Sequence, residues 1–281
     1  MISIITVNYN NAKGLLETLK SVHSQTYDTF EHIVIDGAST DFSLEVIKGY
    51  KTSIDYYISE PDNGVYHAMN KGLRQASGDY VLFLNSGDTL ENETILETVA
   101  KQVNGEYGLY YGNINLIYKE SEKLKTYPQE LNFNFFFESS LPHPATFIKR
   151  KLFDSIFYYN ENYKIVSDWE FFLCAVCKHE VSYCYLNMVI SNYDMSGISS
   201  VEENKSLIIQ EKNSVYKTHF KWLYKDYRDL KSFKTQFLNK RSKTFLELEK
   251  FKVTRGLQSI LFFVFNTLVK FKKLLKRTIN R

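Results

Sequence analysis

The sequence predicts an α/β fold in which a mainly parallel central sheet is flanked by helices. Short apolar runs rich in β-branched residues alternate with longer segments whose apolar residues recur at helical spacing. The apolar runs contain few polar residues, which is typical of parallel strands covered by helices on both faces. The chain has 281 residues, of which 44% are hydrophobic, so it is long enough to bury a substantial core.

The alternation is clearest near the start of the chain. Ile2 to Val7 is predicted to be a strand, and Ala12 to Gln25 a helix with leucines and a valine on one side. The elements predicted after these are a strand at 32–35, a helix at 44–50, a strand at 56–58, a helix at 66–75, a strand at 80–84 and a helix at 89–103. In sheets of this kind, ligands bind beyond the carboxyl ends of the strands.

The composition excludes several classes of protein. With 24% charged residues and a net charge of +3, the chain is neither mainly disordered nor a general polyanion binder, so no nucleic-acid partner is expected. Its three cysteines and its strand-like start, MISIITV, predict a reducing, cytoplasmic location. Cys174 and Cys177 have metal-ligand spacing, but they lie in an apolar helical run without a second Cys or His pair, so core packing is favoured.

Polar clusters follow the three clearest strands at the point where each strand ends. They are Thr6-Val7-Asn8 with Tyr9-Asn10, then Asp36-Gly37-Ala38-Ser39-Thr40-Asp41, and last Asn85-Ser86-Gly87-Asp88. Because parallel strands end at one edge of the sheet, these clusters are predicted to converge there. Asp36 is able to accept hydrogen bonds from a base or a ribose, and its alternative role is that of a carboxylate in a turn. No GxGxxG or Walker sequence follows the first strand, which argues against dinucleotide dehydrogenases, P-loop enzymes and nucleotidyltransferases with a glycine-rich, basic loop.

Five stretches of sequence carry a resemblance to a known family. They are TVNYN, DGASTD, EPDNGVYHAMNKGLRQASGDYVLFLNSGD, HPATFIKRKLF and FYYNENYKIVSDWEFFLCA. In this order and at these separations they resemble glycosyltransferase family 2, whose members are inverting enzymes of the GT-A (nucleotide-diphospho-sugar transferase) fold. The combination of NGVYHAMNKG and FLNSGD is most similar to a subgroup of bacterial exopolysaccharide, capsule and O-antigen assembly, the colanic-acid type.

The resemblance spans about residues 1 to 200 and implies a domain organisation. Residues 1–200 would form the GT-A catalytic domain, with a nucleotide-sugar half at 1–115 and an acceptor and base half at 116–200. Beyond them the alternation of strands and helices stops. Residues 201–281 are predicted to form a helical C-terminal extension with an amphipathic, basic tail.

Asp88 is the candidate metal ligand. Release of a diphosphate from a nucleotide sugar builds up negative charge, which a divalent cation at the mouth of the sheet can neutralise. The family usually has Asp-x-Asp here, whereas this chain has Asn85-Ser86-Gly87-Asp88 and keeps a single carboxylate. A hard cation, Mg2+ or Mn2+, is therefore expected. The alternative is that Asp88 caps the helix predicted at 89–103.

The resemblance also implies which residues bind the nucleotide sugar. They are Thr6, Asn8, Asp36, Asn63, Lys71, Asn85, Ser86 and His143. Asp36 would recognise a uracil base, while Asn63 also belongs to an Asp-Asn-Gly turn signal. Many relatives carry an arginine where this chain has Met69, so Lys71 is the residue left to contact the diphosphate. His143 would either line the donor sugar or complete the end of a strand.

Asp168 is the candidate catalytic base. An inverting transfer needs a carboxylate that takes the proton from the attacking hydroxyl. Asp168 lies in IVSDWEFF at the start of a predicted helix, where helix capping is the alternative role. Glu170 is the second candidate, although it points in another direction on a helix. Trp169 is expected either to form a platform for the acceptor or to pack in the core.

The end of the chain combines an apolar run with a basic cluster. Ile260 to Phe265 is far shorter than the roughly 20 residues needed to cross a bilayer. Basic residues follow at Lys270, Lys272, Lys273, Lys276 and Arg277. This pattern predicts a helix that lies on the anionic inner face of the cell membrane. A helix that forms a homodimer is the rival interpretation.

Two functions follow from these features. The first is an inverting, metal-dependent glycosyltransferase that moves a sugar from a UDP-sugar to a hydroxyl of a lipid-linked or oligosaccharide acceptor in bacterial capsule, exopolysaccharide or O-antigen synthesis. The second is a non-catalytic protein of the same fold that binds a nucleotide sugar or a polysaccharide and has lost part of the metal motif. Metal-dependent hydrolysis of the donor distinguishes the two.

Overall fold

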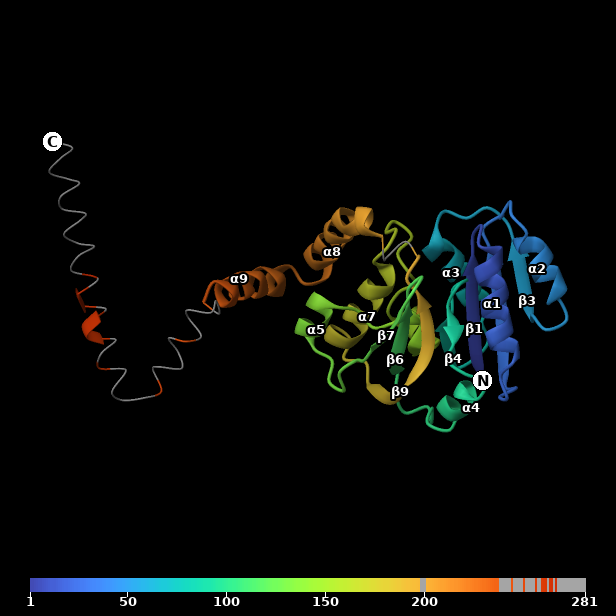
Figure 1. The fold of residues 1–281 in the computed structure, drawn as a ribbon, viewed down its shortest axis with the longest axis horizontal. Helices are drawn as coiled ribbons and strands as arrows, with labels where there is room; N and C mark the ends of the chain where they lie inside the picture. The colour runs from blue at the N-terminus through green and yellow to red at the C-terminus, as the bar shows by residue number, and fades with distance from the viewer. Residues whose placement is uncertain are drawn as a thin grey trace. The chain divides into compact units, whose positions relative to one another are not determined.

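The protein divides into two units, Met1–Val215 and Tyr216–Arg281. A computed structural model describes residues 1–197 and 201–237, together with residues 244, 250, 256, 259–261, 263, 264 and 266. The first unit holds a central sheet with helices packed on it (Figure 1). The described part of the C-terminal extension is mainly helical and includes α9 (Lys221–Phe237).

The elements of the first unit follow one another in the order strand, helix, strand over the first half of the chain. The strands are β1 (Ile2–Asn8), β2 (Phe30–Asp36), β3 (Tyr56–Ser59), β4 (Tyr80–Phe83), β5 (Thr89–Leu90), β6 (Leu109–Ile117), β7 (Glu122–Lys125), β8 (Thr146–Lys149) and β9 (Tyr183–Asp194). The helices are α1 (Ala12–His23), α2 (Ser43–Gly49), α3 (Val65–Gln75), α4 (Ile95–Ala100), α5 (Phe133–Glu138), α6 (Lys151–Ser155), α7 (Ser167–Cys177) and α8 (Lys205–His219), with short 3-10 turns η1 (His143–Ala145) and η3 (Glu202–Asn204).

The sheet has the order β3-β2-β1-β4-β8-β6-β9-β5, with β7 paired to β6. β1 pairs in parallel with both β2 and β4, and β2 pairs in parallel with β3. β8 runs antiparallel to β4 and β6, while β9 runs parallel to β6. The predicted α/β class is confirmed; the sheet is parallel in its N-terminal half and mixed beyond β4.

Helices cover both faces of the parallel strands β1 to β4. Successive residues of a strand point to opposite faces of the sheet, and the apolar side chains on each face are buried by a helix. Leu15 of α1 and Ile47 of α2 pack with Val34 of β2 on one face. Helix α3 packs on the other face, where a Cβ atom at Gly72 would lie 2.5 Å from the side chain of Ile5. Only a glycine lets the helix approach the sheet so closely. This packing fixes the ends of β1, β2 and β4, from which the predicted polar clusters extend.

One predicted helix is wrong. Residues 89–103 do not form a continuous helix: Thr89–Leu90 form β5, and a helix begins only at Ile95. β5 forms because Leu90 pairs with Ser191 of the distant strand β9, which completes an edge of the sheet. Such a pairing leaves no trace in local periodicity, so helical spacing alone misassigned the segment.

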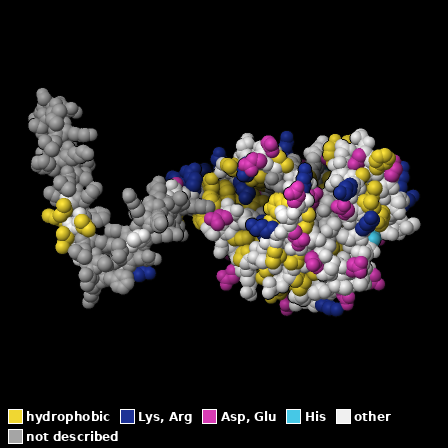
Figure 2. Space-filling view, in the orientation of Figure 1, with side chains coloured by type: hydrophobic (Ala, Val, Ile, Leu, Met, Phe, Trp, Pro, Cys, Tyr) yellow, Lys and Arg dark blue, Asp and Glu magenta, His cyan; other side chains and the backbone are white. Residues whose placement is uncertain are grey.

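Charged side chains of both signs are interspersed over the face of the first unit that Figure 2 shows. The three cysteines are free thiols. Cys174 is fully buried in α7, as expected for a cysteine that packs in the core.

Helices α8 and α9 confirm the predicted C-terminal helices. Within the second unit, the rings of Tyr216 and Tyr224 stack with their centroids 4.4 Å apart. Ile260, Leu261 and Phe263 of the predicted apolar run are exposed. Phe265 and the predicted basic cluster at 270–277 lie outside the described residues. Among the helices that the structure describes, none combines the length and the hydrophobicity that a membrane crossing requires.

Candidate functional site

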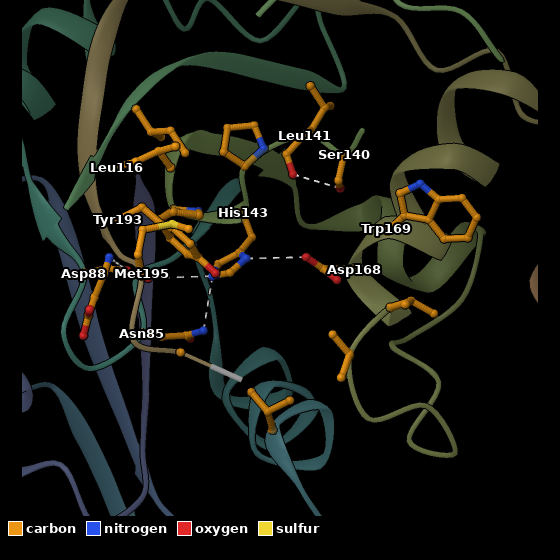
Figure 3. Close-up of a pocket in the computed structure, with 18 of the residues that line it drawn as sticks. Asn85, Asp88, Leu116, Ser140, Leu141, His143, Asp168, Trp169, Tyr193 and Met195 are labelled. Carbon is orange, nitrogen blue, oxygen red and sulfur yellow. Dashed lines mark hydrogen bonds and ion pairs between the residues drawn. The ribbon is translucent and has the colours of Figure 1, made fainter. Parts of the chain in front are cut away.

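A pocket of about 580 Å³ opens beyond the carboxyl end of β4. Figure 3 shows residues from several separate elements that line it. The predicted site residues on its wall are Asn85, Ser86, Asp88, His143 and Asp168. The sheet edge therefore brings together the predicted metal ligand, the predicted base and part of the predicted donor site.

The loop after β4 is held in shape by Thr18 of α1. The Thr18 hydroxyl donates to the backbone carbonyl of Asp88 over 2.7 Å and accepts from the N–H of Gly87 over 3.0 Å. Gly87 has a φ of 106°, and a Cβ atom there would lie 2.8 Å from a carboxylate oxygen of Asp194. A glycine is thus required for both reasons, and it lets the end of β9 approach the loop.

Asp88 is buried, with a relative exposure of 3%. Its Oδ1 accepts a hydrogen bond from the backbone N–H of Asp194 over 3.0 Å, and its Oδ2 lies 3.8 Å from Nε2 of His143. Burial raises the pKa of Asp88, and the nearby His143 opposes this rise. The alternative role as a helix cap is wrong, because the chain continues from Asp88 into β5 and not into a helix.

His143, in the turn η1 (His143–Ala145), lies between the two carboxylates of the pocket (Figure 3). Its Nδ1 is 3.4 Å from Oδ2 of Asp168. Burial alone would lower the pKa of His143, but its contacts with Asp168 and Asp88 outweigh burial and raise the pKa to about 9. The imidazole is therefore a cation at neutral pH, and both of its nitrogens donate.

The charge on His143 also decides how Asn85 is oriented. The nitrogen of the Asn85 side-chain amide lies 3.2 Å from Nε2 of His143. Because a protonated Nε2 needs an acceptor, the pair forms a hydrogen bond only when the amide is turned by 180° so that its oxygen faces the ring. That orientation gives a hydrogen bond to a buried Asn85 oxygen that otherwise lacks one among the described residues.

Asp168 lies in the first turn of α7, which has no side-chain cap. Tyr66 of α3 donates its hydroxyl hydrogen to Oδ1 of Asp168 over 2.7 Å. Burial would raise the pKa of Asp168, but the contacts with His143 and Tyr66 outweigh it and lower the pKa. Asp168 is an ionised carboxylate that faces the pocket. Glu170, the second candidate for the base, is buried and is not among the residues that line the pocket.

Trp169 is packed like a core residue and also belongs to the wall of the pocket. Its indole N–H donates to the carbonyl of Phe136 over 2.8 Å, and the side chain is 2% exposed, as in a core. Its ring nevertheless lines the pocket, and Nζ of Lys212 from α8 lies 4.5 Å from the ring centroid.

Asn8 and Asp36 meet outside this pocket, at the ends of the paired strands β1 and β2. The Asn8 amide donates to Oδ1 of Asp36 over 2.7 Å. Ser39 donates to Asp36 through its backbone N–H and its hydroxyl, and Ser59 through its hydroxyl. Burial would raise the pKa of Asp36, but these donors lower it. Because the carboxylate is fully buried and already accepts four hydrogen bonds, it organises the surrounding loops.

Three other predicted donor residues also lie outside the pocket. Thr6 is buried, and its hydroxyl donates to the carbonyl of Leu84 over 2.8 Å, which ties β1 to β4. Lys71 forms an ion pair of 2.8 Å with Glu60. Asn63 precedes α3 in an exposed turn, where its N–H donates to Nδ1 of His67 over 3.0 Å.

Asp194, Tyr66 and Lys212 line the pocket but were not predicted from the sequence. Asp194 is the last residue of β9, so it is a polar residue at a strand end like those of the predicted clusters, and the sequence offered this signal. Tyr66 and Lys212 lie on helices far in sequence from Asp168, and only the tertiary packing brings them to it.

Comparison with known proteins identifies a family. The profile of Glycosyl transferase family 2 matches residues 3–165, more than half of the chain. An uncharacterized glycosyltransferase of Mycobacterium tuberculosis is 32% identical over 209 residues, which cover 72% of this chain and 78% of that protein. A PGL/p-HBAD biosynthesis glycosyltransferase of Mycobacterium bovis is 30% identical over 215 residues, which cover 74% of this chain and 82% of that protein.

Two solved structures share the fold. Staphylococcus aureus TarS 1–349 in complex with UDP-GlcNAc superposes with a TM-score of 0.57 at 22% identity, covering 69% of this chain and 58% of that one. This chain thus spans less than two thirds of the TarS structure. The mannosyltransferase PcManGT from Pyrobaculum calidifontis, in complex with GDP-Man and Mn2+, gives a TM-score of 0.52 at 14% identity, covering 96% and 86% of the two chains.

These relatives confirm the GT-A fold and the enzyme class that the sequence predicted. They are mycobacterial, staphylococcal and archaeal proteins, and they do not support the expected colanic-acid subgroup. The matched residues 3–165 include the strand-end loops, Asp88 and His143, and Asp168 follows just beyond them. The chain belongs to glycosyl transferase family 2.

Proposed function

We propose that the protein is an inverting glycosyltransferase that moves a sugar from a UDP-sugar to a hydroxyl of a lipid-linked or oligosaccharide acceptor. The observation that carries the proposal is the meeting of Asp88, His143 and Asp168 in one pocket. Two carboxylates with opposite pKa shifts lie on either side of one half-buried cation. Groups with pKa values pushed apart in a pocket are typical of a catalytic site.

Asp168 takes the role of the catalytic base. Its lowered pKa keeps it ionised at neutral pH, so it is able to accept the proton of an attacking hydroxyl. Tyr66 and His143 hold the carboxylate from two sides. Because an inverting transfer is a single displacement, one such base at the acceptor side of the pocket is sufficient for the reaction.

Asp88 takes the role of metal ligand for Mg2+ or Mn2+. The end of β9 places the Asp194 carboxylate beside the Asp88 loop, so the site offers oxygen donors, which hard cations prefer. Among the described residues, no group of three His, Cys, Asp or Glu side chains would hold an ion by itself. With so few ligands of its own, the site fits an ion that is also bound by the oxygens of the donor diphosphate. When bound, this ion would neutralise the charge of the leaving diphosphate.

The nucleotide is proposed to bind beside the pocket, over the ends of β1 and β2. Asp36 and Asn8 shape this region through Ser39 and Ser59, while Thr6 holds β1 to β4 beneath it. Tyr9 is 68% exposed next to Gly37 and offers an aromatic face to a base. Asn63 and Lys71 border the same edge, and Asn85, Ser86 and His143 face the donor sugar and the diphosphate.

The domain roles follow from this arrangement. Residues 1–115 would bind the nucleotide sugar, residues 116–200 would supply the base and the acceptor side, and residues 201–281 would form the C-terminal extension. The exposed Ile260, Leu261 and Phe263 support a peripheral position on the inner face of the cell membrane. A homodimer formed through the same helix is the second candidate, and the test of the tail below separates the two.

A donor panel tests the proposed function. The full chain is mixed with UDP- and GDP-sugars with and without Mn2+, and thermal stability and release of the nucleoside diphosphate are measured. Stabilisation by one UDP-sugar, with metal-dependent hydrolysis, is expected because a ligand that binds only the folded state raises its stability. If no nucleotide sugar stabilises the protein and none is hydrolysed with either metal, the proposed function is wrong.

A further inference from the structure

Two of the lysines that line the pocket lie over aromatic rings. Nζ of Lys212, from α8, lies 4.5 Å from the ring centroid of Trp169. Nζ of Lys125, at the end of β7, lies 5.1 Å from the ring centroid of Tyr127. All four side chains line the pocket. Elements that are distant in sequence thus direct two ammonium groups into the same cavity.

Neither lysine has an anionic partner within ion-pair distance in the part of the chain that the structure describes. Other lysines of the protein do have one: Lys71 pairs with Glu60 and Lys101 with Glu97. Burial lowers the pKa of both pocket lysines, that of Lys212 to about 8, and for Lys212 the charge of Lys125 adds to this fall while Asp168 opposes it. Two neighbouring, partly desolvated cations are costly unless an anion joins them.

Lys212 lies at the end of the pocket remote from the proposed metal ligand, and Lys125 is close enough for its charge to act on Lys212. Figure 3 shows Asp88, His143, Asp168 and Trp169 in succession across the pocket. Lys212 lies over Trp169 and interacts with the charge of Asp168. The donor diphosphate is expected beside Asp88, whereas an acceptor must place its hydroxyl next to Asp168. An anion bound by the lysines would therefore belong to the acceptor.

We infer that Lys125 and Lys212 bind a phosphate group of the acceptor substrate, an inference that rests on the proposed function. Lysine ammonium groups act as point charges that suit phosphate, whereas a planar carboxylate is more often bound by the guanidinium fork of arginine. The pocket of about 580 Å³ leaves room for the sugar or polyol next to the phosphate. The acceptor is thus a sugar or polyol that carries a phosphate ester.

The test measures binding of phosphate-bearing probes to the full chain by calorimetry, with the donor site filled by UDP and Mn2+. Glucose 1-phosphate is expected to bind at least about 10-fold more tightly than glucose, because charge-assisted contacts contribute to affinity. Lys125→Ala and Lys212→Ala are each expected to weaken this binding about 10-fold. Lys123→Ala and Lys205→Ala are matched controls: they remove the same charge from β7 and α8 at exposed positions outside the pocket, and should change affinity less than about 2-fold.

Four results would overturn the inference. The first is that glucose binds as tightly as glucose 1-phosphate, and the second is that the pocket and control variants weaken the binding of glucose 1-phosphate equally. The third is that inorganic phosphate binds as tightly as glucose 1-phosphate, and the fourth is that the probe displaces UDP. Glycerol 3-phosphate serves as the polyol probe. Tighter binding of glucose 1-phosphate points to a lipid-linked sugar as the acceptor. Tighter binding of glycerol 3-phosphate points to a polyol phosphate chain, and either result supports the inference.

Donor hydrolysis by the unaltered protein is measured in parallel. If the protein does not hydrolyse the donor but phosphate binding still depends on the two lysines, only the proposed function is contradicted. If the donor is hydrolysed but phosphate binding is the same in both lysine variants as in the unaltered protein, only the inference is contradicted.

Discussion

Nδ1 of His143 lies 3.4 Å from Oδ2 of Asp168, and Nε2 of the same ring lies 3.8 Å from Oδ2 of Asp88. One half-buried imidazolium thus connects the proposed base with the proposed metal ligand. Its pKa of about 9 means that it carries its charge throughout the neutral range. The two carboxylates are therefore electrostatically linked, and a change at His143 is expected to affect both.

The clearest prediction concerns the base. Asp168→Asn keeps the shape of the side chain and removes its basicity, so turnover should fall by about 10²- to 10⁴-fold while donor affinity changes little. Turnover is measured with a saturating donor, and affinity by calorimetry. Asp154→Asn, at an exposed position on α6, serves as the matched control. A comparable loss of donor binding would make Asp168 a donor-site residue instead.

Replacing His143 should move the pH dependence of the reaction. The acidic limb of kcat against pH reports the pKa of the ionised base, and His143 lowers that pKa in Asp168. His143→Gln removes the positive charge, so the pKa of Asp168 should rise and the acidic limb should shift to higher pH. Tyr66→Phe removes a second contact that lowers the same pKa and should shift the limb in the same direction. An acidic limb that stays in place in both variants would contradict the assignment of Asp168.

Removal of the proposed metal ligand should abolish metal dependence. Asp88→Asn leaves an amide in place of the carboxylate, so donor hydrolysis is expected to fall by at least about 100-fold and to respond no longer to Mn2+. EDTA should have the same effect on the unaltered protein. Circular dichroism and thermal unfolding check that the variant folds. Hydrolysis at the unaltered rate in Asp88→Asn, or in EDTA, would disprove the metal site.

Asp36 should stabilise the fold at neutral pH and lose this effect in acid. Its folded-state pKa lies below the usual value of about 3.9, so the ionised form stabilises the protein above that value. The contribution disappears as the pH falls through the folded-state pKa. Asp36→Asn should therefore be less stable by about 2 kcal/mol or more at pH 7, with a smaller difference near pH 3. Urea unfolding across this pH range measures the difference, and a pH-independent difference would contradict the role of the charge.

Binding of UDP separates two ways in which Asp36 can act. Because its four hydrogen bonds hold the loops at Ser39 and Ser59, Asp36→Asn should weaken UDP binding through the loss of that order. Ser59→Ala removes one of these bonds without touching the carboxylate and should weaken UDP binding to a smaller extent. Unchanged UDP affinity in both variants would show that the nucleotide binds elsewhere.

Truncation after residue 255 should separate membrane binding from catalysis. The truncated chain lacks the apolar run and the basic cluster, so its flotation with anionic liposomes should fall, while donor hydrolysis should persist. Basic residues near an anionic surface contribute about 1 kcal/mol each, so binding by the full chain should weaken as salt rises. A truncated protein that still floats contradicts the membrane role. Conversion of a dimer into a monomer on a sizing column would favour the rival interpretation.

The N-terminal part of the sheet and its helices could be predicted from local sequence pattern. The alternation of apolar runs and helical spacing predicted β1, α1, β2, α2, β3, α3 and β4 in order, because each element buries its own apolar face. Asn85, Ser86 and Asp88 were predicted to lie at a binding edge for the same reason. Residues 89–103 were misassigned because β5 owes its strand conformation to a partner strand near the end of the domain.

The sequence by itself determined the α/β class, the strand-end loops and the chemical types of the candidate residues, since periodicity and turn chemistry act over a few residues. Only the tertiary structure decided which side chains meet. It placed His143 between Asp88 and Asp168, brought Tyr66 to the base, buried Asp36 among four donors and set Lys125 and Lys212 in one pocket. These contacts join elements far apart in the chain, and their pKa shifts depend on burial and on charges that no local pattern contains.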